Sequence, residues 1–199
     1  MDLISEGAEA KVYSEGNSVI KERVSKNYRH PKIDSQIISS RTRLEAKIID
    51  KLKSFDCAPK LISVSENEIT MQKVEGEELN SAIADNKISV EDAANNVARI
   101  LFLLHSKNVI HGDVTPKNFI LDNNSKLFVI DFGLSVISTR EEDKAYDIAM
   151  CKETFSLYPE FYESLEQSYL KLFDDDKKKE TFEERLQLIF SRGRNKKKN

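Results

Sequence analysis

The spacing of apolar residues predicts short strands in the first part of the chain. β-like runs at residues 11–13 and 18–21 are separated by a turn-prone sequence, Glu15-Gly16-Asn17. Two more strand-like segments follow at residues 60–64 and 68–74. We therefore expect a small sheet near the N-terminus.

Helical periodicity separates these two groups of strands and dominates the rest of the chain. Apolar residues recur at helical spacing from about residue 34 to residue 53, and Asp34 is the expected cap of this helix. Ser89 is placed to cap a second helix that ends near residue 105. Residues 144–189 again follow a mostly helical pattern.

The mixture of strand-like and helical segments ends at the sequence Val74-Glu75-Gly76, and a mostly helical pattern follows. We predict an α+β fold of two lobes. Residues 1–74 form an N-lobe of one β-sheet and one helix, and residues 75–191 form a small helical C-lobe. Residues 192–199 form a basic tail.

Composition indicates an ordinary globular protein. A chain of 199 residues, 39% hydrophobic and 33% charged, is long enough to bury a core. No apolar run approaches the length of a membrane span, and the first residues lack the pattern of a secretory signal. Cys57 and Cys151 are too few for a disulfide framework, so we expect reduced thiols and a cytoplasmic protein.

The charge of the chain is unevenly distributed. A net charge of −3 argues against a general nucleic-acid binder. No acidic residue follows Glu184, whereas basic residues continue to the end: Arg185, Arg192, Arg194, Lys196, Lys197 and Lys198. Such a tail is usually a solvated end, and the alternative is a contact with RNA phosphates.

A predicted hairpin brings two polar residues together. Short strands at 119–121 and 127–130 are joined by a turn over 122–125. Asn118 precedes the first strand and Asp131 follows the second. Because the two ends of a hairpin are neighbours, we expect these residues to lie side by side.

Asp113, Asn118 and Asp131 are the residue types that phosphoryl transfer from ATP requires. A carboxylate must orient the acceptor, and hard oxygen ligands must hold Mg²⁺. Asp113 suits the first role, and Asn118 and Asp131 suit the second. Taken singly, Asp113 and Asn118 would be ordinary turn residues, but their spacing with the hairpin favours the catalytic interpretation.

Lys21 is a candidate ligand for the α- and β-phosphates because it ends a strand-like run. Glu45 is its expected partner, since it lies on the apolar stripe of the first helix, where a charge is costly unless it is paired. The alternative is a peripheral glutamate. Residues 5–12 occupy the place of a phosphate-covering loop, but Gly7 is their only glycine, so this loop alone does not predict nucleotide binding.

These residues resemble the protein-kinase superfamily over essentially the whole chain. Residues 111–118 look like its catalytic loop and residues 131–133 like its metal-binding motif. Met71 is similar to the gatekeeper, and Gln72-Lys73-Val74 to the hinge that holds adenine through backbone hydrogen bonds. The resemblance implies a bilobal protein-kinase-like fold with a minimal C-lobe, and ATP and Mg²⁺ between the lobes. It assigns the nucleotide and metal to Gly7, Lys21, Glu45, Met71, Gln72, Val74, Asn118 and Asp131.

The chain also departs from ordinary protein kinases. Gly112 stands where arginine is usual, and Thr115 where lysine is usual, so Lys117 is expected to offset γ-phosphate charge instead. Only a few residues separate Gly133 from a segment carrying Asp147, which looks like the buried aspartate of the central C-lobe helix. The platform for peptide substrates is therefore expected to be mostly missing.

Further motifs narrow the match. Residues 7–10, 28–34, 41–46 and 192–194 are similar to the PRPK-type small atypical kinases, the kinase subunit of the KEOPS complex, in its archaeal form. This resemblance implies a Ser/Thr kinase and ATPase that supports threonylcarbamoyl-adenosine formation at position 37 of tRNA. It also implies that the C-lobe binds the threonylcarbamoyltransferase subunit, the N-lobe binds a small regulatory subunit, and the tail acts near the partner and tRNA.

Two other functions remain open. One is a stand-alone Ser/Thr kinase with dedicated protein substrates, and the other is a nucleotide-binding scaffold without catalysis. The short segment after Asp131 argues against the first, and the filled catalytic positions argue against the second.

Overall fold

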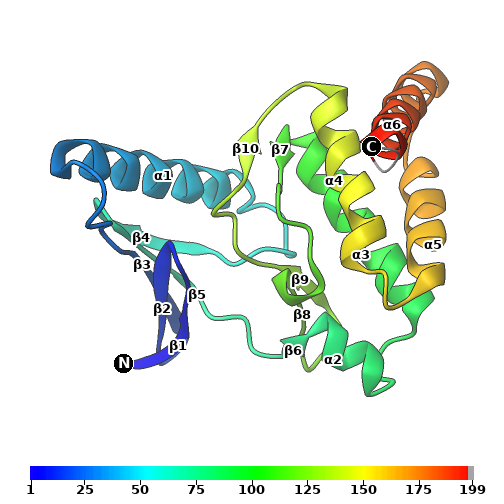
Figure 1. The fold of residues 1–199 in the computed structure, drawn as a ribbon. Helices are drawn as coiled ribbons and strands as arrows, with labels where there is room; N and C mark the ends of the chain where they lie inside the picture. The colour runs from blue at the N-terminus through cyan, green and yellow to red at the C-terminus, as the bar shows by residue number, and fades with distance from the viewer. Residues whose placement is uncertain (197–199) are drawn as a thin grey trace.

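The N-terminal lobe is an antiparallel sheet packed against one long helix (Figure 1). The computed structural model describes residues 1–196, and this sheet has the strand order β1-β2-β3-β5-β4. Its strands are β1 (Asp2–Glu6), β2 (Ala10–Glu15), β3 (Ser18–Arg23), β4 (Leu61–Val64) and β5 (Glu68–Gln72). The predicted strands around Lys21 and Ile69 are therefore neighbours, with these two residues opposite each other.

Helix α1 (Pro31–Lys51) packs on the sheet through its periodic apolar residues. Ile48 and Ile49 are fully buried, and Glu45 lies on the same buried face. The apolar stripe thus carries a carboxylate into the interior of the lobe, where it needs a cationic partner.

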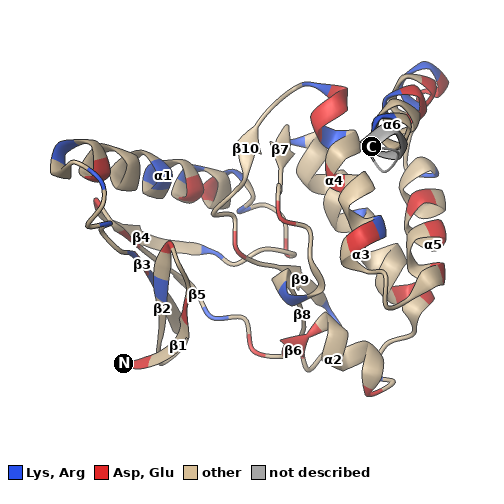
Figure 2. Ribbon diagram, viewed as in Figure 1, with Lys and Arg blue, Asp and Glu red and all other residues tan. Residues whose placement is uncertain are grey.

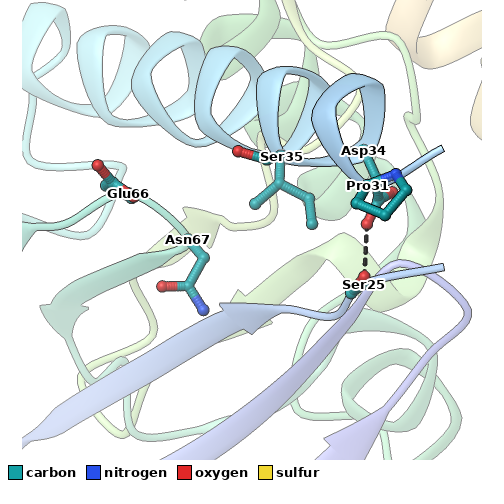
Figure 3. A pocket seen from close by; sticks show the side chains of 7 residues that line it. Ser25, Pro31, Asp34, Ser35, Glu66 and Asn67 are labelled. Carbon is teal, nitrogen blue, oxygen red and sulfur yellow. Dashed lines mark hydrogen bonds between the residues drawn. The ribbon is translucent and has the colours of Figure 1, made fainter. Parts of the chain in front are cut away.

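Asp34 does not cap this helix, contrary to the expectation from the sequence. The helix begins at Pro31, and His30 is an N-cap without a side-chain hydrogen bond. Proline suits the first helical position because its backbone angle is already helical and it has no N–H to satisfy. Asp34 is buried, and its carboxylate accepts a hydrogen bond of 2.6 Å from the Ser25 hydroxyl (Figure 3) and one of 3.1 Å from the Lys26 N–H. It ties the connection between β3 and α1 to the helix.

The C-terminal lobe is helical, as predicted. Ser89 caps α3, because its hydroxyl oxygen accepts a hydrogen bond of 3.0 Å from the Asp92 N–H. The helices are α2 (Leu79–Ala84), α3 (Val90–Ser106), α4 (Glu141–Thr154), α5 (Pro159–Leu170) and α6 (Asp176–Lys196). The sequence did not predict α2, because its 6 residues are too few to show a helical period. Within residues 1–196, no helix combines the length and apolarity needed to cross a membrane.

Two small sheets position the loops of this lobe. The predicted hairpin is present as β8 (Phe119–Leu121) and β9 (Leu127–Val129), with β6 (Glu77–Glu78) at its edge. A 3₁₀ turn, Pro116–Asn118, leads into β8. In the second sheet, β7 (Val109–Ile110) pairs with β10 (Val136–Ile137). These strands of two residues each were not predicted, since they are too short to show alternation.

Helix α6 runs without a break through Arg192 to Lys196, so the start of the predicted tail is not an end of secondary structure. In the first part of α6, up to Glu184, Lys residues are interspersed with Asp and Glu (Figure 2). Arg192 donates a hydrogen bond of 2.6 Å to Glu142 at the start of α4. The predictions for Lys197 and Lys198 lie outside the described residues.

Gly112 generates a prediction about stability, with Gly16 as its control. Gly112 has a φ of +78°, and a Cβ there would lie 2.7 Å from the carbonyl oxygen of Leu134. Gly16 also has a positive φ, +56°, but a Cβ there would meet nothing within 4 Å. We expect Gly16→Ala to lower the free energy of unfolding by about 1 kcal/mol, and Gly112→Ala by about 2–4 kcal/mol, because overpacking adds to the backbone strain.

Urea denaturation of the two variants beside the unchanged chain measures both losses. Equal losses would contradict the close approach of Leu134 to the catalytic loop.

Candidate active site

A cleft of about 420 Å³ lies between the two lobes. It is lined by most of the residues that the sequence assigned to nucleotide, metal and catalysis: Lys21, Met71, Gln72, Val74, Asp113, Lys117, Asn118 and Asp131. Glu45 does not line the cleft, because it is buried behind Lys21. Gly7 is not a lining residue either, and Ile4 and Ser5 of β1 are present there.

One end of the cleft is apolar. Its walls come from both lobes, from β2, β3 and β5 on one side and from the hairpin on the other: Val12, Val19, Met71, Ile120 and Ile130. Two opposed aliphatic walls suit a flat heterocycle such as a purine. The predicted hinge borders this end, and its Lys73 N–H donates to the Asn17 carbonyl at 2.9 Å, which ties the hinge to the turn between β2 and β3.

Pro59 and Glu78 are among the lining residues that the sequence did not identify. Glu78 is the N-cap residue of α2 and follows the hinge. A carboxylate at that place can accept hydrogen bonds from sugar hydroxyls. The only sequence feature that could have marked Glu78 as a cleft residue is its position just after the boundary at residues 74–76, because α2 itself was not recognised.

The other end of the cleft is charged, and Lys21 is its centre. The Lys21 Nζ donates to Glu45 Oε1 at 2.8 Å, which confirms the predicted pair. The same Nζ donates to Asp131 Oδ1 at 2.7 Å. One ammonium group therefore joins the sheet, helix α1 and the predicted metal-binding motif of the C-terminal lobe.

These contacts shift the proton affinities of the pair in opposite directions. Burial alone would lower the pKa of Lys21, but the attraction of Glu45 and Asp131 outweighs it and raises this pKa above its ordinary value. Burial alone would raise the pKa of Asp131, but Lys21 and the Gly133 N–H outweigh it and lower this pKa. Both groups are therefore charged at neutral pH.

Asp113 and Asn118 meet across the catalytic loop. The Asn118 side-chain amide donates to the backbone oxygen of Asp113 at 2.8 Å and to its carboxylate at 3.0 Å. Because the amide nitrogen is used in this way, the amide oxygen is the atom left for a cation. The Asp113 carboxylate lines the cleft, where it can accept a hydrogen bond from a hydroxyl or a water.

Asp147 of α4 anchors the catalytic loop from inside the C-terminal lobe. It is fully buried, as the sequence predicted. Its carboxylate accepts hydrogen bonds from the backbone N–H groups of His111, at 2.6 Å, and Gly112, at 2.9 Å. The His105 ring bridges Asp147 Oδ2, at 3.2 Å, and the Tyr169 hydroxyl, at 2.7 Å. The sequence did not reveal Tyr169, because a buried aromatic residue in α5 is ordinarily a packing residue.

The phosphate-covering loop is tied to its surroundings. Gly7 N–H donates to the Ala10 carbonyl at 2.9 Å, which closes the turn between β1 and β2. The Glu9 carboxylate pairs with Arg41 of α1, and Lys26 Nζ donates to the Ala8 carbonyl. The loop is therefore connected to α1 through side chains, although it has a single glycine.

The donor set fits Mg²⁺ bound together with a nucleotide. Among residues 1–196 there is no group of three or more His, Cys, Asp or Glu side chains that could hold a metal alone. Asn118 and Asp131 offer two hard oxygen ligands at one end of the cleft. Mg²⁺ is usually held by one or two such protein ligands, with phosphate oxygens and waters completing its shell.

Comparison with known proteins shows which class of protein this chain belongs to. Residues 1–168 match the family model described as the protein kinase domain. A solved structure of monomeric WbdD has a TM-score of 0.58 and 20% identity, covering 78% of this chain and 44% of that one, and it shows the same fold. The chain belongs to the protein kinase domain family.

Two curated relatives narrow this assignment. One is the "EKC/KEOPS complex subunit BUD32" of Encephalitozoon cuniculi, 42% identical over 144 residues, covering 72% of each chain. Within the protein kinases, the chain is a member of the Bud32 family. The second is a "Probable bifunctional tRNA threonylcarbamoyladenosine biosynthesis protein" of Methanobrevibacter smithii. It is 37% identical over 208 residues, which cover 97% of this chain and 36% of that protein. The family resemblance predicted from the sequence is confirmed.

The ion pair of Lys21 and Asp131 predicts a pH dependence of stability. Because the pKa of Asp131 is lowered, its contribution is present above the ordinary carboxyl value of 3.8 and is lost as pH falls through the lowered pKa. The contribution of Lys21, whose pKa is raised, is lost only as pH rises through that raised value, so it stays constant across the acidic range.

We expect Asp131→Asn to lower the free energy of unfolding at pH 7 by up to about 1 kcal/mol, since a partly exposed ion pair is worth little more. This deficit should shrink as the pH falls below about 4. Denaturant titrations between pH 7 and pH 3 measure it. Glu15→Gln is the control, because Glu15 is exposed and makes no ion pair within residues 1–192. A deficit of the same size at both pH values would contradict the charged pair.

Proposed function

We propose that this chain is an atypical Ser/Thr kinase and ATPase that works in a KEOPS-type complex, supporting threonylcarbamoyl-adenosine modification of tRNA at position 37. The observation that carries the proposal is the assembly in one cleft of Lys21, paired with Glu45, and of Asp113, Asn118 and Asp131. The names of the two curated relatives support the biological setting.

In this proposal the apolar end of the cleft holds adenine, with Met71 as gatekeeper and Gln72 and Val74 in the hinge. Lys21 neutralises α- and β-phosphate charge, and Glu45 holds the lysine in place. Asn118 and Asp131 are the ligands for Mg²⁺, which supplies electrostatic stabilisation of the transferring phosphoryl group when it is bound.

Residues of the catalytic loop then act on the transfer of the γ-phosphoryl group. Asp113 accepts a hydrogen bond from the attacking hydroxyl or water and orients it toward the γ-phosphate. Lys117 is exposed and lines the cleft, so its ammonium is available to offset negative charge on that phosphate.

The segment after the metal-binding motif favours ATP turnover over phosphorylation of dedicated protein substrates. Helix α4 begins at Glu141, so only residues 134–140 separate it from Gly133. Part of this segment is held as β10 against β7, and the Ser135 hydroxyl donates to the His111 carbonyl at 2.8 Å. It therefore offers little backbone for docking a peptide. A scaffold without catalysis is disfavoured because every expected catalytic position is filled.

Partner binding follows from the family setting. We propose that the C-lobe contacts the threonylcarbamoyltransferase subunit and the N-lobe a small regulatory subunit. The bifunctional relative supports the first contact, because this chain matches about a third of a single protein named for threonylcarbamoyladenosine biosynthesis. The basic tail, which comprises Arg192, Arg194, Lys196, Lys197 and Lys198, is proposed to contact tRNA phosphates near the transferase.

Substitution of the proposed catalytic carboxylate tests the chemistry. We expect Asp113→Ala to lower the kcat for ATP turnover by about 10²–10⁴-fold, because the acceptor loses its orienting base. Thermal unfolding should be little changed. Asp56→Ala is the control, since Asp56 is an exposed carboxylate that does not line the cleft. Undiminished turnover by folded Asp113→Ala protein would remove Asp113 from the mechanism.

Deletion of residues 192–199 tests the tail. The assembled complex should lose tRNA-modification activity, and the difference from the unchanged complex should shrink as the salt concentration rises, because salt screens the phosphate contacts that only the unchanged tail makes. ATP turnover by the isolated chain should be unchanged. A full-length variant with glutamine at the basic positions 194 and 196–198 separates charge from length. Full activity of both variants would show that the tail is only a solvated end.

A further inference from the structure

Glu45 has a second cationic partner besides Lys21. Arg23 is the last residue of β3, two positions after Lys21, and is 5% exposed. Its Nη2 donates to Glu45 Oε2 at 2.5 Å, whereas Lys21 Nζ takes the other oxygen, Oε1, at 2.8 Å. The two oxygens of one buried carboxylate are therefore held by two cations from the same strand.

Lys21, Arg23, Glu45 and Asp131 form a cluster of charged side chains. Its positive and negative charges balance only when Arg23 is included. Lys21 is shared between Glu45 and Asp131, so one positive charge faces two negative ones. Arg23 supplies the second positive charge. A buried carboxylate that depends on a shared partner is costly. Arg23 therefore removes the dependence of Glu45 on Lys21.

Arg23 does not act on the nucleotide directly, because it does not line the cleft. Its Nε is buried and has no hydrogen-bond partner within residues 1–192, whose side chains the structure describes. An unpaired buried donor is unfavourable, so the position is not explained by the general stability of the sheet. The contact with Glu45 is the side-chain interaction that Arg23 makes there.

The rest of the molecule explains why such a contact is needed. In the proposed function Lys21 binds phosphates and Asp131 binds Mg²⁺, so the contact of 2.7 Å between them would be exchanged when the nucleotide binds. The contact of Lys21 with Glu45 would be exposed to the same rearrangement. Ordinary kinases can position this helix through a phosphorylated activation segment. Here Gly112 replaces the arginine that would read such a phosphate, and the segment after Gly133 is short.

We propose that Arg23 is a positioning residue that fixes Glu45, and with it α1, to the sheet while Lys21 exchanges Asp131 for the phosphates. The site is thereby assembled without phosphorylation of the chain. This inference rests on the proposed ATP turnover, but the position of α1 can be measured without it.

The kinetic test compares three variants of the full chain. We expect Arg23→Met to lower kcat/KM for ATP by about 10- to 100-fold through misplacement of Lys21. Arg23→Lys should recover most of this loss, because it restores the positive charge. Arg43→Met is the control, since Arg43 is exposed on α1 and makes no ion pair within the described residues. Values for folded Arg23→Met within about twofold of the unchanged chain would overturn the proposal.

The second test is hydrogen exchange of the backbone of α1 in the absence of nucleotide. Exchange over residues 38–49 should stay slow in Lys21→Met, because Arg23 still holds Glu45, and should accelerate in Arg23→Met. Faster exchange in Lys21→Met than in Arg23→Met would assign the anchoring to Lys21 and overturn the proposal. If the unchanged chain does not turn over ATP, the proposed function fails, whereas the exchange result still decides the role of Arg23.

Discussion

Lys21 is the point at which the sheet, helix α1 and the C-terminal lobe are held together. Its ammonium contacts Glu45 at 2.8 Å and Asp131 at 2.7 Å, inside a region where an unpaired charge is costly. Each partner comes from a different part of the chain, so the contact can form only when both lobes have folded and closed on each other. The position of this proposed phosphate-binding group is thus a consequence of the overall fold.

The catalytic loop depends on a second buried charge, Asp147. The backbone N–H groups of His111 and Gly112 donate to this carboxylate, and Gly112 is packed against the carbonyl of Leu134. The short segment after Gly133 therefore lies directly on the catalytic loop. We propose that an active site built in this way needs no phosphorylation to be assembled, and that partners control its turnover. This agrees with a family whose curated members are named as subunits of a complex.

Most of the residues that meet in the cleft could be predicted from the sequence, because their residue types stand at fixed spacing. Asn118 and Asp131 flank a hairpin, and Glu45 is a charge on an apolar stripe, so both signals are local. Short elements were missed: α2 and the β7–β10 pair contain too few residues to show a period. Asp34 was misassigned because Pro31 makes a side-chain cap unnecessary. The buried contact of Arg23 with Glu45 could not be predicted, since an arginine at a strand end is usually solvated.

The most direct test of the central claim is ATP turnover by the purified chain, measured alone and then with a threonylcarbamoyltransferase partner and tRNA. We predict Mg²⁺-dependent release of phosphate by the chain itself, and a change in its rate when the partner and tRNA are added. Absence of turnover in all of these conditions, from protein shown to be folded, would contradict an assembled phosphoryl-transfer site around Lys21.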